Sequence, residues 1–232
     1  MVLDYGSQYT QLIGRRIREM NVLSIMLPGD VGMDRILECH PKVIILSGGP
    51  NSIHVEGSPR VPPGFFEWAE ENKIPVLGIC YGMQMLVHLL GGRVKEADGR
   101  GEYGKMSIDP VAPSTLYGDD AGKPQTVWMS HGDEADSLPS GFVCSAKSKQ
   151  GAVVAIEDTT RNFYGLQYHP EVMHSERGAA TLRRFLFDIC GLRGDWSMEN
   201  VLEEQIAIVR RQVRGVSSPM VVRWGMGLAR SI

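Results

Sequence analysis

The feature of this sequence that most constrains its fold is the run GICYG, in which Gly78 and Gly82 flank Cys80. An apolar run at 75–79 predicts a buried strand before the cysteine, while residues 83–90 have the spacing of a helix. A cysteine at such a turn takes a strained backbone, and side chains at the flanking positions would collide with neighbouring backbone. We therefore expect a strand, a sharp turn at Cys80 and a helix.

The position of Cys80 just before a helix favours a reactive sulfur. Backbone N–H groups and the positive end of the helix dipole point at the sulfur, which favours thiolate over thiol, and the same N–H groups can stabilise an oxyanion. A lone cysteine after an apolar run is more often a small buried hydrophobic residue. From spacing alone, both interpretations of Cys80 remain open.

A cysteine nucleophile needs a base and a group that orients the base, and QYHPE at 167–171 offers both. It ends the last apolar strand, and Pro170 stiffens the step from His169 to Glu171. Glu171 can then hold one ring nitrogen while the other faces sulfur. A strand-end histidine beside a solvated glutamate is the alternative for an isolated His-x-Glu. Of the other histidines, His131 is the main rival for the role of base.

Alternation of apolar runs and helical spacing predicts an α/β fold. Strands are expected at 1–6, 22–27, 43–46 and 75–79, and helices at 65–71, at 83–90 and in a segment capped by Ser7 that ends near Met20. This first half predicts a parallel sheet with crossover helices. Strands at 127–129, 142–146, 153–157 and 163–168 add an antiparallel portion, and a helix at 176–189 closes the domain. Residues 98–125 are expected to be irregular, because Gly, Pro and Asp punctuate them.

The run SGGP at 47–50 follows a buried strand and lets backbone approach a ligand closely. An exposed N–H there, from Gly49, would complete an oxyanion hole with the N–H of Tyr81. A phosphate loop is the alternative, but neither the GxxxxGK[ST] nor the GxGxxG pattern is present. A plain tight turn also remains open.

Composition and charge exclude several classes of protein. The 232 residues carry a net charge of −3, without the basic surplus of nucleic-acid or membrane-surface proteins. The four cysteines are scattered without a CxxC pair, which argues against a disulfide scaffold or a zinc site and favours a reducing compartment. With no apolar run of about 18 residues and no leader pattern, we expect a cytoplasmic (cytosolic) protein without a metal.

Five motifs carry a resemblance to a known family. In order along the chain they are LDYGSQYTQLIGRRIRE, ILSGGPNSI, GICYGMQML, WMSHGDE and GLQYHPEV. With them the chain resembles the class I glutamine amidotransferase domain, in the variant at the N-terminus of GMP synthetase, over residues 1 to about 213. The resemblance implies a flavodoxin-like three-layer sandwich with a mostly parallel central sheet and a small antiparallel addition.

The resemblance also implies a chemistry. Cys80 would attack the side-chain amide of glutamine, His169 would protonate the departing ammonia, and Glu171 would complete the triad. Gly49 and Tyr81 would supply the oxyanion N–H groups. Further contacts to glutamine would come from Gln84, Ser130, His131, Gly132 and Asp133. His131 then becomes a substrate-site residue rather than a base, although a plain turn histidine remains an alternative.

The resemblance fails in the C-terminal region. In the family, ammonia passes to a second domain that adenylates XMP with ATP and magnesium and then aminates it to GMP. Residues 196–213 resemble the linker helix before that domain, but an SGGVDS phosphate loop does not follow. We expect an amidotransferase domain at 1–193, a linker helix and aberrant basic tail at 194–232, and no cofactor in this domain. A synthetase domain or chain is the expected ammonia acceptor, and this chain alone is expected not to form GMP.

Two other functions remain open on the sequence. A γ-glutamyl hydrolase or cysteine peptidase can share the cysteine turn and the triad, although the five motifs together favour the amidotransferase. A non-catalytic remnant is the other possibility, favoured by the aberrant tail and opposed by the intact triad residues. Covalent labelling by a glutamine-like electrophile would separate these possibilities.

Overall fold

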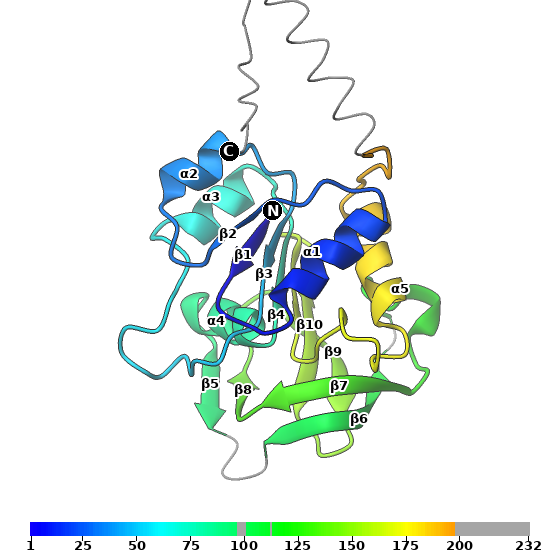
Figure 1. Ribbon diagram of the computed structural model, residues 1–232. Coiled ribbons are helices and arrows are strands. Elements are labelled where there is room, and N and C mark those ends of the chain that lie inside the picture. The colour runs from blue at the N-terminus through cyan, green and yellow to red at the C-terminus, as the bar shows by residue number, and fades with distance from the viewer. Residues whose placement is uncertain (97–100, 112, 198–232) are drawn as a thin grey trace, which may run out of the picture. The chain divides into compact units, whose positions relative to one another are not determined.

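Parallel strands form one half of an eleven-stranded mixed sheet in the computed structural model, which describes residues 1–96, 101–111 and 113–197 (Figure 1). In sheet order they are β2 (Met26–Pro28), β1 (Val2–Asp4), β3 (Ile44–Leu46), β4 (Val76–Ile79) and β11 (Phe163–Leu166). Every residue of β3 and β4 is buried, which explains their continuous apolar sequence. Because parallel strands end at the same edge, the segments that follow β3, β4 and β11 meet there.

The other half of the sheet is antiparallel. From β11 outward the strands are β10 (Val153–Asp158), β9 (Val143–Ser148), β6 (Glu102–Pro110) and β7 (Gln125–His131). A further antiparallel pair joins at β10 and consists of β8 (Asp133–Ser137) and β5 (Arg93–Glu96). Gly132 alone separates β7 from β8, so the chain passes from one pairing to the other within residues 131–133.

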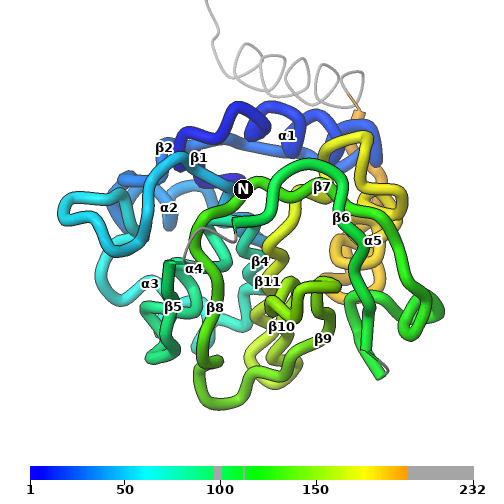
Figure 2. The backbone as a smooth tube through the Cα atoms, turned by 90° about the horizontal axis from the view of Figure 1, so that it is seen from below, coloured from blue at the N-terminus to red at the C-terminus, as the bar shows by residue number. Residues whose placement is uncertain are grey.

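Helices cover both faces of the sheet, as Figure 2 shows from below. One face carries α1 (Thr10–Glu19) and α5 (Gly178–Arg183), which continues as a π-helical turn (Arg184–Ile189). The other face carries α2 (Met33–Glu38), α3 (Phe65–Glu71) and α4 (Tyr81–Leu89); a short 3₁₀ turn spans Gly118–Asp120. Strand β3 shows the alternation: Ile45 packs in the core with α1 and α5, while Ile44 and Leu46 pack with α3 and α4. The predicted three-layer α/β sandwich is confirmed.

The predicted site residues all lie in one compact unit, Met1–Asp195. From residue 198 onward, the predicted linker helix and basic tail lie outside the described residues. The predicted domain boundary after residue 193 therefore stays a prediction. None of the helices in the described ranges has the length and apolar character that crossing a bilayer requires.

Several observed elements differ from the predicted ones. Residues expected to be irregular contain β6, because β7 and β9 pair with it on both sides. The strand expected at 22–27 begins only at Met26 and includes Pro28, which is tolerated because β2 is the outer strand. Ser7 is not the cap residue of α1; Tyr9 is, and its N–H donates to Ser7 Oγ at 3.1 Å. The sequence pattern did not indicate the short elements α2, β5 and β8.

Gly78 and Gly82 allow α4 to start directly against the strand ends. A Cβ at Gly82 would lie 2.3 Å from the carbonyl oxygen of Leu46, and one at Gly78 would lie 2.6 Å from the carbonyl group of Gly82. Gly82 also donates its N–H to Ser47 O at 3.1 Å. These contacts involve backbone that side-chain rotation cannot relieve, so the steric reason predicted for the two glycines is confirmed.

We expect Gly82→Ala to destabilise the protein by about 3 kcal/mol, because the added Cβ meets a backbone carbonyl that cannot move without displacing β3. Gly32→Ala is the matched control, since Gly32 has φ −68° and no described atom within 4 Å of the added Cβ. Its effect should stay within about 1 kcal/mol, because Gly32 is the N-cap residue of α2 and alanine caps a helix less well than glycine. Urea unfolding measures both, and equal stabilities would contradict the close packing.

Candidate active site

Chain segments converge where β3, β4 and β11 end. The register pairs Ile79 of β4 with Leu166 of β11, and β3 lies on the other side of β4. Cys80 follows β4, and its N–H donates to Leu166 O at 2.7 Å. The parallel pairing therefore continues for one residue beyond the strand. It places Cys80 beside the segment that leads from Leu166 to His169.

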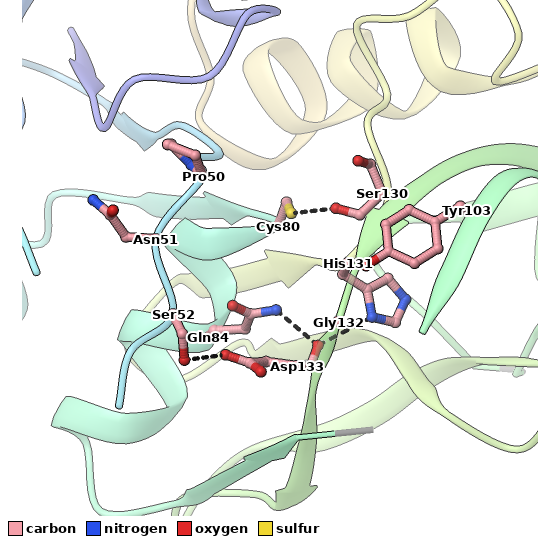
Figure 3. A pocket seen from close by; sticks show the side chains of 11 residues that line it. Pro50, Asn51, Ser52, Cys80, Gln84, Tyr103, Ser130, His131, Gly132 and Asp133 are labelled. Atoms are coloured by element: carbon pink, nitrogen blue, oxygen red, sulfur yellow. Dashed lines mark hydrogen bonds between the residues drawn. The ribbon is translucent and has the colours of Figure 1, made fainter. Parts of the chain in front are cut away.

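Cys80 occupies a strained turn at the start of α4. Its backbone has φ 51° and ψ −108°, in a region where non-glycine residues are uncommon. Such strain costs about 1–3 kcal/mol and persists only where the surrounding structure imposes it. The side chain is buried, and Sγ lies 3.5 Å from the carbonyl oxygen of Ser130 (Figure 3). The sulfur thus faces the C-terminal end of β7.

His169 is held by contacts to three other elements. Its N–H donates to Trp128 O of β7 at 3.0 Å, and its carbonyl oxygen accepts from Ser175 Oγ at 2.6 Å. Its ring meets the ring of Tyr9 edge-on, with 5.0 Å between centroids. Nδ1 lies 2.8 Å from Glu171 Oε1. The imidazole is therefore oriented by its own backbone, by an aromatic neighbour and by a carboxylate.

Gly48 packs against both the imidazole of His169 and the side chain of Cys80. A Cβ at Gly48 would lie 2.9 Å from Cε1 of His169 and 3.4 Å from Cβ of Cys80. Burial by itself would lower the pKa of His169, but the hydrogen bonds and charges of Cys80 and Glu171 raise it from 6.5 to about 10. The raised pKa favours the protonated ring at neutral pH, in which Nδ1 donates to Glu171 Oε1.

Glu171 is buried, and one of its oxygens serves His169. The other, Oε2, is buried without a hydrogen-bond partner among the described residues. A buried carboxylate with so few partners keeps its charge only beside a positive group, which the imidazolium supplies. The carbonyl oxygen of Glu171 accepts from Arg16 Nε of α1 at 3.2 Å, so α1 holds this segment in place.

A cavity of about 350 Å³ opens beside Cys80 (Figure 3). The predicted substrate and oxyanion residues that line it are Gly49, Gln84, Ser130, His131, Gly132 and Asp133. Tyr81 is not among the lining residues; it is the first residue of α4, and its phenol donates to Pro59 O at 2.7 Å. Lining residues to which the sequence analysis assigned no role are Pro50, Asn51, Ser52 and Tyr103.

The missed lining residues differ in the signal that they offer. Pro50, Asn51 and Ser52 belong to the loop after β3 and lie within the ILSGGPNSI motif, so the signal was present although no role was assigned to these residues. Tyr103 lies in β6, in the region expected to be irregular, and no pattern marks it. Its side chain is 66% exposed although it lines the cavity, so it borders the cavity on the solvent side.

Hydrogen bonds hold the cavity wall formed by residues 130–133, which we call the 130–133 wall. Gln84 Nε2 donates to Asp133 O at 2.8 Å, and Ser52 Oγ donates to Asp133 Oδ2 at 2.5 Å. Gln84 Nε2 also lies 3.3 Å from Gln167 Oε1. The amide nitrogen of Gln84 is thus committed to the protein, and its carbonyl oxygen is the atom left for a ligand.

His131 is not placed to act as a base on Cys80. Nδ1 lies 3.0 Å from Asp133 O, and Nε2 lies 3.2 Å from Glu102 Oε2. Both ring nitrogens therefore have protein partners, which supports a role in the cavity wall. Among the described residues, which include His131 and Glu102, no group of three or more His, Cys, Asp or Glu side chains could hold a metal ion.

Comparison with known protein families matches residues 1–189 to the family described as "Glutamine amidotransferase class-I". The chain is 46% identical over 213 residues to a GMP synthase (glutamine-hydrolyzing) from Heliobacterium modesticaldum. It is 49% identical over 215 residues to the protein of that name from Lactococcus lactis. Each alignment covers 92% of this chain and 40% of the relative, so the chain spans less than half the length of these relatives.

A solved structure has the same fold. It is a protein of Thermoplasma acidophilum provisionally described as a GMP synthase subunit, with a TM-score of 0.70 and 28% sequence identity. The match covers 93% of this chain and 96% of that one.

We expect the imidazole of His169 to titrate near pH 10, as measured by NMR of ring-labelled histidine with His169→Gln to assign the signal. Cys80→Ala removes one of the hydrogen bonds that raise the pKa, so the titration should move down toward 6.5. Because the folded-state pKa is raised, the stability contributed by His169 is present below about pH 6.5 and is lost as the pH rises toward 10. An unchanged His169 titration in Cys80→Ala would place the sulfur out of reach of the ring.

Proposed function

Because this chain belongs to the class I glutamine amidotransferase family, we propose that it hydrolyses the side-chain amide of glutamine to glutamate and ammonia. Cys80 is the nucleophile, His169 is the proton carrier, and Glu171 orients and charges the imidazole. The observation that carries the proposal is one buried imidazole that is hydrogen-bonded to the Glu171 carboxylate and packs with Cys80 against Gly48, with its pKa raised by both partners.

The first step forms a glutamyl thioester. The thiolate of Cys80 adds to the amide carbon, and the N–H groups of Gly49 and Tyr81 stabilise the negative oxygen. The C–N bond then breaks as His169 gives its proton to the nitrogen, which leaves as ammonia. The raised pKa of His169 supports this step, because the ring already carries that proton at neutral pH.

The second step hydrolyses the thioester. His169, now neutral, takes a proton from water as the oxygen adds to the thioester carbon. The C–S bond breaks, glutamic acid leaves and loses its proton to solvent, and the thiolate and imidazolium are restored. Glu171 stays ionised throughout, so that each cycle returns the imidazole to the same orientation.

The cavity beside Cys80 supports an amino-acid substrate. Its volume of about 350 Å³ accommodates a glutamine whose amide meets the sulfur. We assign the amino-acid end to the 130–133 wall, where the Asp133 carboxylate accepts from the α-ammonium group and backbone N–H groups meet the α-carboxylate. The carbonyl oxygen of Gln84 accepts from the substrate amide nitrogen.

The ammonia is proposed to serve amination of XMP to GMP. The support is the name of the relatives, GMP synthase (glutamine-hydrolyzing), and the 40% of their length that this chain spans. A synthetase domain or chain that uses ATP and magnesium is the proposed acceptor, and the glutaminase step needs no cofactor. The reaction is placed in the cytosol, where the four unpaired cysteines would stay reduced.

A diazo-ketone analogue of glutamine tests the nucleophile. We expect a single adduct on Cys80 by peptide mass mapping, no adduct in Cys80→Ala, and ammonia release from glutamine by the unmodified protein. His169→Gln should slow labelling about 100-fold or more, because it removes the general acid and the positive partner of sulfur. Cys144→Ala is the matched control and should label as the wild type does.

An adduct that persists in Cys80→Ala would contradict the assignment of the nucleophile. Hydrolysis of γ-glutamyl peptides without ammonia release from glutamine would favour a γ-glutamyl hydrolase instead. Absence of any adduct and of any ammonia would favour a non-catalytic protein.

A further inference from the structure

One backbone carbonyl holds the 130–133 wall, and it accepts two side-chain hydrogen bonds. The oxygen of Asp133 accepts from Gln84 Nε2 at 2.8 Å and lies 3.0 Å from His131 Nδ1. Figure 3 shows both bonds converging on this oxygen from either side. The position of the wall relative to Cys80 therefore depends on these two side chains.

His131 faces an acceptor at each ring nitrogen. Asp133 O can only accept, so Nδ1 must donate to it, and Glu102 Oε2 lies 3.2 Å from Nε2. One proton between Nε2 and Oε2 then satisfies the second contact, whichever of the two groups carries it. Burial alone would raise the pKa of Glu102, but the interactions with His131 and Ser148 together outweigh burial and lower it. Glu102 and His131 thus form a buried hydrogen-bonded pair, with His131 in the wall and Glu102 behind it.

Strand pairing fixes the positions of Glu102 and His131 relative to each other. Glu102 and His131 are direct partners in the register of β6 and β7, and both are nearly inaccessible to solvent. His131 lines the cavity, whereas Glu102 stands behind it and is not among the lining residues. Oε1 of Glu102 is buried without a hydrogen-bond partner among the described residues. A buried oxygen without a partner lowers the stability of the fold. This argues that the Glu102 carboxylate is kept for its hydrogen bond to His131.

We propose that Glu102 is a positioning residue for glutamine recognition, which acts through His131 to hold the 130–133 wall against the amino-acid end of the substrate. This inference rests on the proposed glutaminase function. Glu102 does not touch the reacting atoms. Its loss should therefore weaken binding of ligands that carry an amino-acid end and leave the reactivity of Cys80 unchanged.

Two variants break the hydrogen bond between residue 102 and His131 Nε2 in different ways, and a third preserves it. Glu102→Met removes the acceptor, and Glu102→Asp withdraws it by one methylene. In Glu102→Gln the side-chain amide can donate to Nε2 of a neutral His131, whose Nδ1–H still donates to Asp133 O. The third variant therefore keeps the wall in place without the charge.

The measurement compares two reagents on Cys80 in the full chain. The diazo-ketone carries the amino-acid end of glutamine, whereas iodoacetamide does not. Glu102→Met and Glu102→Asp should raise the half-saturating diazo-ketone concentration about tenfold, and Glu102→Gln should stay within about threefold of the wild type. The maximal labelling rate and the iodoacetamide rate should stay within about twofold in all three.

Glu157→Met is the matched control for loss of a buried carboxylate. Glu157 lies on β10 and accepts from the backbone N–H groups of Thr115 and Leu116, away from the cavity. This variant should lower the melting temperature and leave the half-saturating concentration at the wild-type value.

Three outcomes would overturn the inference. The first is wild-type half-saturation in Glu102→Asp, or in Glu102→Met where that variant folds. The second is an equal loss of diazo-ketone and iodoacetamide labelling, and the third is a Glu102→Gln as impaired as Glu102→Met or Glu102→Asp. A wild-type chain that takes no diazo-ketone on Cys80 would instead overturn the proposed function and this inference with it.

Discussion

The backbone corner at Cys80 is the constraint on which the rest of the site depends. A positive φ at a cysteine must be imposed from outside, and the hydrogen bonds Cys80 N–H to Leu166 O and Gly82 N–H to Ser47 O impose it. These bonds also tie the ends of β3 and β11 to the start of α4. The contacts that maintain the strain are therefore the contacts that bring Gly48 and His169 to the sulfur.

Electrostatic interactions among Cys80, His169 and Glu171 add to the constraints that the backbone imposes on the site. His169 lies between two groups that favour its protonated form, and all three side chains are buried. In a site with little water, such charges interact strongly and hold one another in place. Glu171 has one oxygen without a partner among the described residues, so the imidazolium is its main compensation. The pKa of His169 thus depends on both of its neighbours, Cys80 and Glu171.

Sequence reasoning succeeded where the determinants are local. β3 and β4 are buried throughout and read as apolar runs, and the steric need for Gly78 and Gly82 follows from the turn itself. It failed where partners are distant. Glu102 meets His131 across 29 residues, and Ser52 meets Asp133 across 81. Strand β6 was not predicted for the same reason. Pairing with β7 and β9 stabilises it, and its own sequence pattern does not indicate a strand. Whether the nitrogen or the oxygen of the Gln84 side-chain amide is left for a ligand is likewise decided by its tertiary partners.

The two halves of the sheet contribute different parts of the cavity. Cys80 and His169 follow strands of the parallel half, whereas residues 130–133 comprise the end of β7, Gly132 and the start of β8 in the antiparallel half. In the proposed function, selectivity and reactivity thus reside on separate pieces of backbone. Changes in the antiparallel hairpins could alter which substrate binds while the nucleophile is kept. One architecture could then act on many substrates that donate nitrogen, or on substrates that donate none.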